Sequence, residues 1–170
     1  MRVGHGFDAH RLVEGRPLVL GGVRIPSERG ALGHSDGDAL AHALADALLG
    51  AAALPDLGSR FPSSDAGWKD ADSMELLAQC AAAVRDAGFT IVNVDATIVV
   101  ERPKLLAFVA PMRARVAARL ELPLDAVGVK AKTSDGMGYT GDGGGLAVHA
   151  VALLLVRVGP PSQPPTGDRG

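Results

Sequence analysis

The chain has 170 residues, of which 47% are apolar, and a formal net charge of −2. This size and composition predict one globular domain, and the near-neutral charge, with no stripe of lysine or arginine, argues against a nucleic-acid partner. The longest apolar run, residues 150–156, is far shorter than the ~20 residues that cross a bilayer. The first ten residues lack the pattern of a signal peptide. We therefore expect a cytoplasmic protein without a membrane partner.

The first third of the chain contains strand patterns followed by a helix pattern. Residues 3–7 predict a short strand, and residues 17–26 predict two short strands joined as a hairpin. Ser35, followed three residues later by Asp38, resembles a capping box. The helix that this box would open runs through the alanine-rich and leucine-rich residues 38–54.

Helices and strands then alternate along the rest of the chain. A helix is predicted over residues 72–87, with a capping aspartate or serine at its start and a glycine after its end. Residues 89–101 are rich in β-branched side chains and predict a strand. A third helix is expected to start near Pro111, because proline suits the first turn. Residues 126–133 predict another strand.

The order of these elements predicts an α/β or α+β layered fold. The last apolar segment, residues 146–158, suits a buried strand or a buried helix equally. Residues 159–170 are rich in proline and glycine, so we expect a flexible tail after a domain of residues 1–158. The one cysteine, Cys80, lies on a helical apolar pattern and is predicted to pack in the core.

Asp8, His10 and His42 are candidate metal ligands. In an extended segment Asp8 and His10 face the same side, so a carboxylate and an imidazole can point at one ion. Catalytic zinc usually has three protein ligands, and His42 on the predicted helix is the candidate third. Alternatively, Asp8 simply caps a turn. Asp38 and Asp46 flank His42 at four residues on either side, where one of them could orient its imidazole unless both are solvated surface residues.

Residues 133–145, TSDGMGYTGDGGG, form a glycine-rich stretch that could bind phosphate. Glycine lets backbone N–H groups approach a phosphate closely. The stretch is not a Walker loop, because the GxxxxG that such a loop requires before its lysine is missing. An ordinary glycine-rich surface turn is the alternative. Our interpretation is that this stretch meets residues 4–15 and 33–42 in one metal and phosphate site.

Motifs over about residues 1–157 resemble the 2-C-methyl-D-erythritol 2,4-cyclodiphosphate synthases. In chain order they are GHGFDAH (4–10), GGVRIP (21–26), GHSDGDALAHALADALLGAAALPDLG (33–58), RFPSSD (60–65), ADSMELL (71–77), RPK (102–104) and KAKTSDGMGYTGDGGGLAVHAVALL (130–154). The most specific of them is HSDGD followed four residues later by histidine. The resemblance implies an enzyme that acts on a small molecule.

The resemblance implies a lyase of non-mevalonate isoprenoid biosynthesis. Its substrate would be 4-diphosphocytidyl-2-C-methyl-D-erythritol 2-phosphate, whose 2-phosphate attacks the β-phosphorus of the diphosphate and expels CMP, giving the 2,4-cyclodiphosphate. The family likeness also implies a mixed β-sheet with helices packed on one face, in a homotrimer whose sheets face inward and whose sites lie between subunits. The last apolar segment would then be a strand.

Residue by residue, the likeness assigns metals and substrate contacts. Asp8, His10 and His42 resemble the ligands of one Zn²⁺ per subunit, and Asp135, where the family commonly has glutamate, resembles the ligand of a Mg²⁺ or Mn²⁺ ion. The positions that resemble the family's substrate contacts are Asp8, Ala9, His10, His34, Ser35, Asp56, Leu57, Gly58, Phe61, Pro62, Ser63, Ser64, Asp65, Val100, Pro103, Lys104, Leu105, Leu106, Lys132, Thr133, Ser134, Asp135, Tyr139 and Asp142.

Two residues match catalytic positions, and, besides Asp135, the residues at 132, 139, 142 and 144 depart from the family pattern. His34 and Thr133 resemble residues that stabilise the transition state by hydrogen bonds to phosphate oxygens. Asp142 stands where arginine is usual, Gly144 where glutamate is frequent, and Tyr139 where phenylalanine is usual. A carboxylate at position 142 cannot make the phosphate contact of arginine and would repel a nearby diphosphate.

Two other functions fit parts of the pattern. A zinc-dependent phosphohydrolase would use the same three ligands to activate water and would release inorganic phosphate. A trimeric protein that binds CMP or diphosphate without turnover would keep the fold and the metal, and the departure at Asp142 favours it. His5 and His149 match no site and are predicted to have packing or surface roles.

Overall fold

The computed structural model describes residues 1–33, 35–62, 64–65, 67 and 71–157. His34, Ser63 and the predicted tail at 159–170 lie outside the described residues. Within the described ranges, no helix has the length and apolar character that a bilayer-spanning helix needs.

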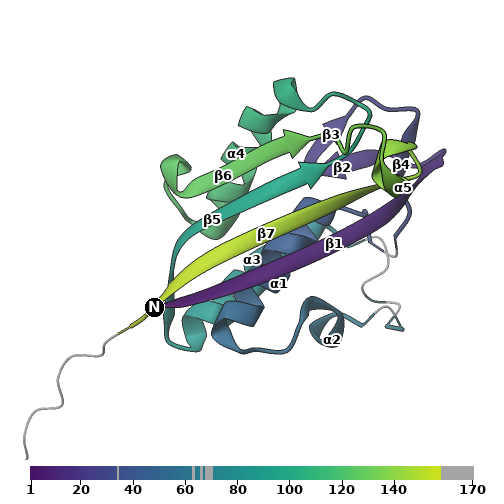
Figure 1. Cartoon of the computed structure of the whole chain (residues 1–170). Coiled ribbons are helices and arrows are strands. Elements are labelled where there is room, and N and C mark those ends of the chain that lie inside the picture. The colour runs from purple at the N-terminus through teal and green to yellow at the C-terminus, as the bar shows by residue number, and fades with distance from the viewer. Residues whose placement is uncertain (34, 63, 66, 68–70, 158–170) are drawn as a thin grey trace, which may run out of the picture.

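A five-stranded mixed sheet forms one layer of the domain (Figure 1). Its strands, in spatial order, are β4 (Arg29–Ala31), β1 (Arg2–Glu14), β7 (Gly145–Val156), β5 (Phe89–Val99) and β6 (Val127–Lys132). β5 and β6 run parallel, and the other neighbours are antiparallel. A separate hairpin consists of β2 (Leu18–Leu20) and β3 (Val23–Ile25), which confirms the hairpin predicted from the sequence.

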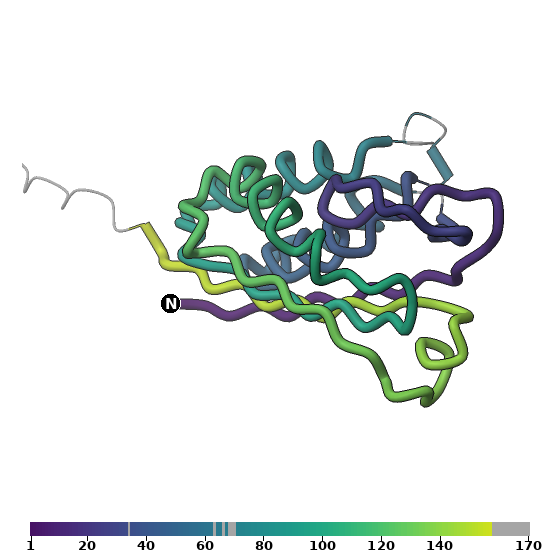
Figure 2. The backbone as a smooth tube through the Cα atoms, turned by 90° about the horizontal axis from the view of Figure 1, so that it is seen from above, coloured from purple at the N-terminus to yellow at the C-terminus, as the bar shows by residue number. Residues whose placement is uncertain are grey.

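Three long helices cover one face of the sheet and leave the other face open (Figure 2). They are α1 (Ala39–Ala52), α3 (Ser73–Asp86) and α4 (Leu106–Leu120). Shorter pieces are α2 (Leu57–Arg60), α5 (Gly138–Gly141) and a 3₁₀ turn at Leu124–Ala126. The predicted class, a mixed sheet with helices on one face, is therefore confirmed. Cys80 is fully buried on α3, and burial raises the pKa of its thiol to about 11.

One strand settles a point that the periodicity left open, and another is longer than predicted. β7 is a strand, as the family likeness implied, and its buried and exposed residues alternate from Val148 to Ala152 because one face meets the helices. β1 is longer than predicted, because ten of its residues pair with β7 and its last three pair with β4. Asp8 and His10 therefore lie inside a strand, on the same face.

The predicted cap of one helix and the predicted start of another were wrong. α1 begins at Ala39 with Asp38 as its N-cap, and the Asp38 carboxylate accepts from the N–H of Ala41, so Ser35 does not cap it. α4 begins at Leu106 rather than near Pro111, which lies within the helix. Leu105, the residue before the helix, is buried in the core and so fixes the earlier start. Pro111 lies inside the helix and costs it one backbone hydrogen bond, because proline has no N–H group.

Gly4 and Gly6 set the distance between β1 and α1. A Cβ built on Gly4 would lie 2.0 Å from the carbonyl oxygen of Ala47, and one on Gly6 would lie 1.9 Å from that of Ala43. Any side chain at either position would push the helix away from the strand. The two glycines therefore allow α1 to approach closely enough for His42 to reach the side chains of β1.

Candidate functional site

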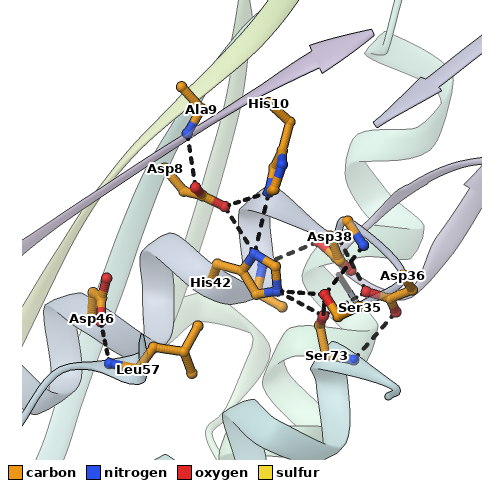
Figure 3. Close-up of polar contacts among 12 residues, drawn as sticks. Asp8, Ala9, His10, Ser35, Asp36, Asp38, His42, Asp46, Leu57 and Ser73 are labelled. Atoms are coloured by element: carbon orange, nitrogen blue, oxygen red, sulfur yellow. Dashed lines mark hydrogen bonds and ion pairs between the residues drawn. The ribbon is translucent and has the colours of Figure 1, made fainter. Parts of the chain in front are cut away.

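Asp8, His10 and His42 converge between β1 and α1 (Figure 3). Oδ2 of Asp8 lies 2.9 Å from Nε2 of His10 and 2.9 Å from Nδ1 of His42, and the two nitrogens are 3.4 Å apart. A tetrahedral zinc ion with bonds of ~2.0 to 2.1 Å holds its ligand atoms about 3.3 Å from one another. The donor atoms thus have the types and spacing that a zinc-like ion requires.

The ionisation of Asp8 and His10 reflects their pairing. Burial raises the pKa of the Asp8 carboxyl, but the hydrogen bonds and positive charges of His10 and His42 outweigh it, so that this pKa lies well below its usual range. The hydrogen bond to Asp8 raises the pKa of His10 above its usual value, against the opposing effect of burial. Asp8 is therefore ionised at neutral pH, as a metal ligand must be.

A backbone carbonyl fixes the tautomer of His10. Its Nδ1 lies 2.9 Å from the carbonyl oxygen of Leu32, which can only accept a hydrogen bond. His10 consequently keeps a proton on Nδ1, and Nε2, which faces Asp8 and His42, is the nitrogen that can bind an ion in place of a proton. Such a hydrogen bond on the far nitrogen is typical of histidines that bind metals.

Neither Asp38 nor Asp46 orients His42, so that prediction was wrong. Asp38 is fully buried, and its carboxylate accepts from the N–H groups of Gly21 and Gly22 at 2.8 and 2.7 Å as well as capping α1. Desolvation raises its pKa. Asp46 accepts from the N–H of Leu57 at 2.8 Å, so it joins the start of α2 to α1. Neither is a freely solvated surface residue either.

The partner of His42 is a hydroxyl group that the sequence did not single out. Nε2 of His42 lies 2.8 Å from Oγ of Ser73 and 3.2 Å from Oγ of Ser35. Ser73 is only 1% exposed, and its hydroxyl group also contacts the Asp36 carboxylate. The sequence marks Ser73 only as a helix-start residue within the ADSMELL motif, and its burial against α1 depends on tertiary packing.

A second polar region surrounds the end of β6 and the start of α4. A cavity of about 480 Å³ lies there, and its lining includes both apolar side chains and three lysines. The residues of the predicted substrate set that line it are Val100, Pro103, Lys104, Leu105, Leu106, Lys132 and Thr133. Four further lining residues, Val109, Val129, Lys130 and Ala131, were not predicted.

Within one chain, this cavity and the metal-ligand triad do not meet. The cavity lining includes none of Asp8, His10 and His42. β1 and β6 are three strand positions apart, or about 14 Å in the sheet. The segment after β6 also leaves the sheet on the side opposite the helices (Figure 2), whereas the triad lies between β1 and α1, on the side of the helices. Within a single chain the cavity is therefore separate from the triad, although the end of the glycine-rich stretch lies beside β1, where Leu12 donates its N–H to the carbonyl oxygen of Gly144 at 2.9 Å.

The glycine-rich stretch after β6 is largely exposed. Asp135 is exposed and has a left-handed backbone with φ of 55°, and Tyr139 is also exposed. The hydroxyl group of Thr140 donates to Oγ of Ser134 at 2.7 Å and holds α5 against the loop. The stretch therefore leaves two carboxylates, those of Asp135 and Asp142, exposed to solvent.

Asp142 has a local structural contact. Its Oδ1 accepts from the N–H of Gly144 at 2.7 Å and closes a turn before β7. The guanidinium group of Arg29 on β4 donates to the carbonyl oxygen of Gly143 at 3.1 Å, so a cation lies beside this turn. The departure from arginine at position 142 thus coincides with an aspartate that stabilises its own loop.

The remaining predicted contacts lie on β1, before α1 and around α2. Ala9 donates its N–H to Oδ1 of Asp8 at 2.9 Å. Asp56 caps α2 by accepting from the N–H of Ser59 at 2.8 Å. Ser35 lies at the triad. The α2 segment follows α1, which carries His42, and the predicted contacts in it are Leu57, Gly58, Phe61, Pro62, Ser64 and Asp65.

Comparison with known proteins gives consistent matches over most of the chain. The YgbB family model matches residues 1–155. A 2-C-methyl-D-erythritol 2,4-cyclodiphosphate synthase of Burkholderia ambifaria is 57% identical over 154 residues, which cover 91% of this chain and 96% of that protein. A synthase of the same name from Burkholderia lata is 56% identical over 158 residues, covering 93% of this chain and 98% of that protein.

Solved structures agree with these matches. A 2C-methyl-D-erythritol-2,4-cyclodiphosphate synthase in a CDP-bound form has a TM-score of 0.84 and 40% identity, over 91% of this chain and 100% of that one. The bifunctional IspDF of Campylobacter jejuni has a TM-score of 0.88 and 42% identity over 91% of this chain, which spans only 42% of that protein. Because the family match includes the elements that carry the triad and those that carry the cavity, the chain belongs to the YgbB family.

Proposed function

We propose that the chain is a 2-C-methyl-D-erythritol 2,4-cyclodiphosphate synthase. It would cyclise 4-diphosphocytidyl-2-C-methyl-D-erythritol 2-phosphate and release CMP. The observation that carries the proposal is the triad of Asp8, His10 and His42, whose atoms are spaced for a tetrahedral ion in a chain 57% identical to a synthase of that name. No side-chain nucleophile is required, because the attacking phosphate belongs to the substrate.

The triad supports one Zn²⁺ ion per subunit. Two imidazole nitrogens and a carboxylate oxygen are a usual donor set for catalytic zinc, which leaves one position for a substrate oxygen. When bound, the ion supplies a Lewis acid and a template for phosphate oxygens. Asp135 offers an exposed carboxylate oxygen, which is the ligand type that Mg²⁺ or Mn²⁺ prefers.

The cavity beside β6 suits the cytidine and diphosphate part of the substrate. Its volume, about 480 Å³, is within the ~300 to 1,000 Å³ range of small-molecule sites. Val100 and Leu106 supply apolar surface for a base, and Lys104 and Lys132 supply positive charge for phosphates. The Thr133 hydroxyl group can donate to a phosphate oxygen as negative charge develops, the role also proposed for His34.

A homotrimer would bring the triad and the cavity together. The open face of the sheet bears exposed apolar side chains, among them Val3, Phe7, Val151 and Leu155. Since the triad and the Thr133 cavity lie apart in one chain, a site between subunits would combine one chain's triad with a neighbour's cavity. We expect light scattering to give three times the mass of one chain, and a monomer mass would contradict this assembly. A cytoplasmic location belongs to the same proposal, given the highly charged substrate.

The reaction can be tested directly. The purified protein is incubated with the cytidyl diphosphate substrate and Mg²⁺, products are followed by phosphorus NMR, and CMP is measured by chromatography. We expect a cyclic diphosphate together with an equimolar amount of CMP. Inorganic phosphate would instead indicate the phosphohydrolase, and bound but unconverted substrate would indicate a binding protein without turnover.

A further inference from the structure

A partly buried hydrogen-bonded chain connects Asp36, Ser73 and His42 (Figure 3). Ser73 is the first residue of α3, and its hydroxyl group lies between the Asp36 carboxylate and Nε2 of His42. Asp36 is held in place by the N–H groups of Asp38 and Ser73, at 3.1 and 3.2 Å. The chain therefore joins three elements, namely the segment before α1, α1 itself and the start of α3.

The direction of these hydrogen bonds follows from what each group can do. An ionised carboxylate only accepts, so the single proton of the Ser73 hydroxyl group points to Asp36. Oγ of Ser73 then presents a lone pair to His42, and Nε2 of His42 must be the donor at 2.8 Å. His42 held in this way keeps its proton on Nε2, so Nδ1, the atom that faces the Asp8 carboxylate and His10, is the nitrogen that can bind an ion in place of a proton.

We propose that Ser73 is a positioning residue, aligned by Asp36, that holds His42 in the tautomer and orientation needed to bind the metal through Nδ1. This inference rests on the proposed metal site. The Leu32 carbonyl gives His10 the equivalent constraint through the backbone, whereas His42 depends on two side chains. Ser35 also contacts His42, but at 3.2 Å, and its Oγ accepts from the N–H of Gly37 at 3.3 Å.

The test measures metal binding and the histidine tautomer in the full chain. We expect Ser73→Ala to weaken Zn²⁺ binding about 10-fold to 100-fold, the usual effect of removing a partner of a metal ligand. Ser73→Thr, which keeps the hydroxyl group, should retain most of the affinity. Zn²⁺ affinity is measured by competition with a chromophoric chelator, and circular dichroism establishes that each variant is folded.

Asp36→Asn tests whether metal binding depends on the direction of these hydrogen bonds rather than on side-chain packing. The asparagine has the same shape, but its NH₂ group can donate to Ser73, which lets the hydroxyl proton turn toward His42 and favours the proton on Nδ1. We expect weaker Zn²⁺ binding although Ser73 is intact. Imidazole ¹⁵N NMR of the metal-free protein should show a proton on Nε2 of His42 in the parent chain, whether or not Nδ1 also carries one for Asp8, and the loss of that Nε2 proton in Ser73→Ala and Asp36→Asn.

Ser35→Ala is the matched comparison, because it removes the other hydroxyl group near His42 and should weaken binding less than Ser73→Ala. Unchanged Zn²⁺ affinity in Ser73→Ala would overturn the inference, and so would a larger loss in Ser35→Ala. If the parent chain binds no Zn²⁺, the proposed metal site fails, and the NMR comparison still decides whether Ser73 sets the tautomer of His42.

Discussion

Replacing His42 by alanine is expected to remove nearly all of the bound metal and to reduce CMP release more than about 100-fold, because even the outer partners of metal ligands change affinity 10-fold to 100-fold. In the parent chain we expect about one zinc-like ion per chain. With His42 absent, Asp8 and His10 alone leave a tetrahedral ion with only two protein ligands.

The measurement is elemental analysis of the purified variant, alongside CMP release from the cytidyl diphosphate substrate. His149→Ala is the matched control for metal content, since His149 is exposed on the open face of the sheet and lies outside the triad. The control should keep about one ion per chain. Full metal occupancy in His42→Ala would show that the ligand assignment is wrong.

Replacing Gly6 by alanine is expected to destabilise the fold by about 3 kcal/mol or more, at the upper end of what overpacking costs. The new Cβ would lie 1.9 Å from the carbonyl oxygen of Ala43 and 2.7 Å from the backbone nitrogen of Ala47, so α1 would have to move. Because His42 precedes Ala43 on that helix, the same movement should also lower the metal content.

Urea unfolding, followed by circular dichroism, gives the free energy of unfolding of each variant. Gly50→Ala provides the control, because a Cβ built at that position in the same helix meets nothing within 4 Å apart from its chain neighbours and the backbone of its own helix. Alanine in a helix should stabilise this variant by about 0.5 to 1 kcal/mol. A Gly6→Ala variant as stable as the parent would mean that α1 and β1 are less tightly packed than the structure indicates.

The elements that could be predicted are those whose patterns are local. The strands at 89–101 and 126–133 and the helix at 72–87 have clear periodicity and end signals, and they lie within one or two residues of their predicted limits. The start of α4 was missed because burial of Leu105 in the core places the helix start there, and this outweighs the preference of proline for a first turn. The three-residue β4 exists only through its pairing with β1.

The metal ligands could be proposed because their spacing is a local property of a strand and because their motifs resemble a family. The groups around them could not. The charge and position of Asp38 suggested a partner for His42, yet its carboxylate turns back to N–H groups at the start of α1 and in the β2–β3 turn. Ser73 is 31 positions from His42 in the sequence, and the two meet only because α3 packs against α1. The hydrophobic periodicity of the sequence does not predict that contact.

The separation of the triad from the Thr133 cavity has a genetic consequence under the proposed assembly. Each chain would contribute its metal ligands to one site and its cavity to another, so every site would be built from two polypeptides. Two alleles, one defective at His42 and the other at Thr133, could then complement each other in a mixed trimer. At a subunit interface where the intact triad of one mutant chain meets the intact cavity of the other, an active site would form from two polypeptides that are each inactive alone.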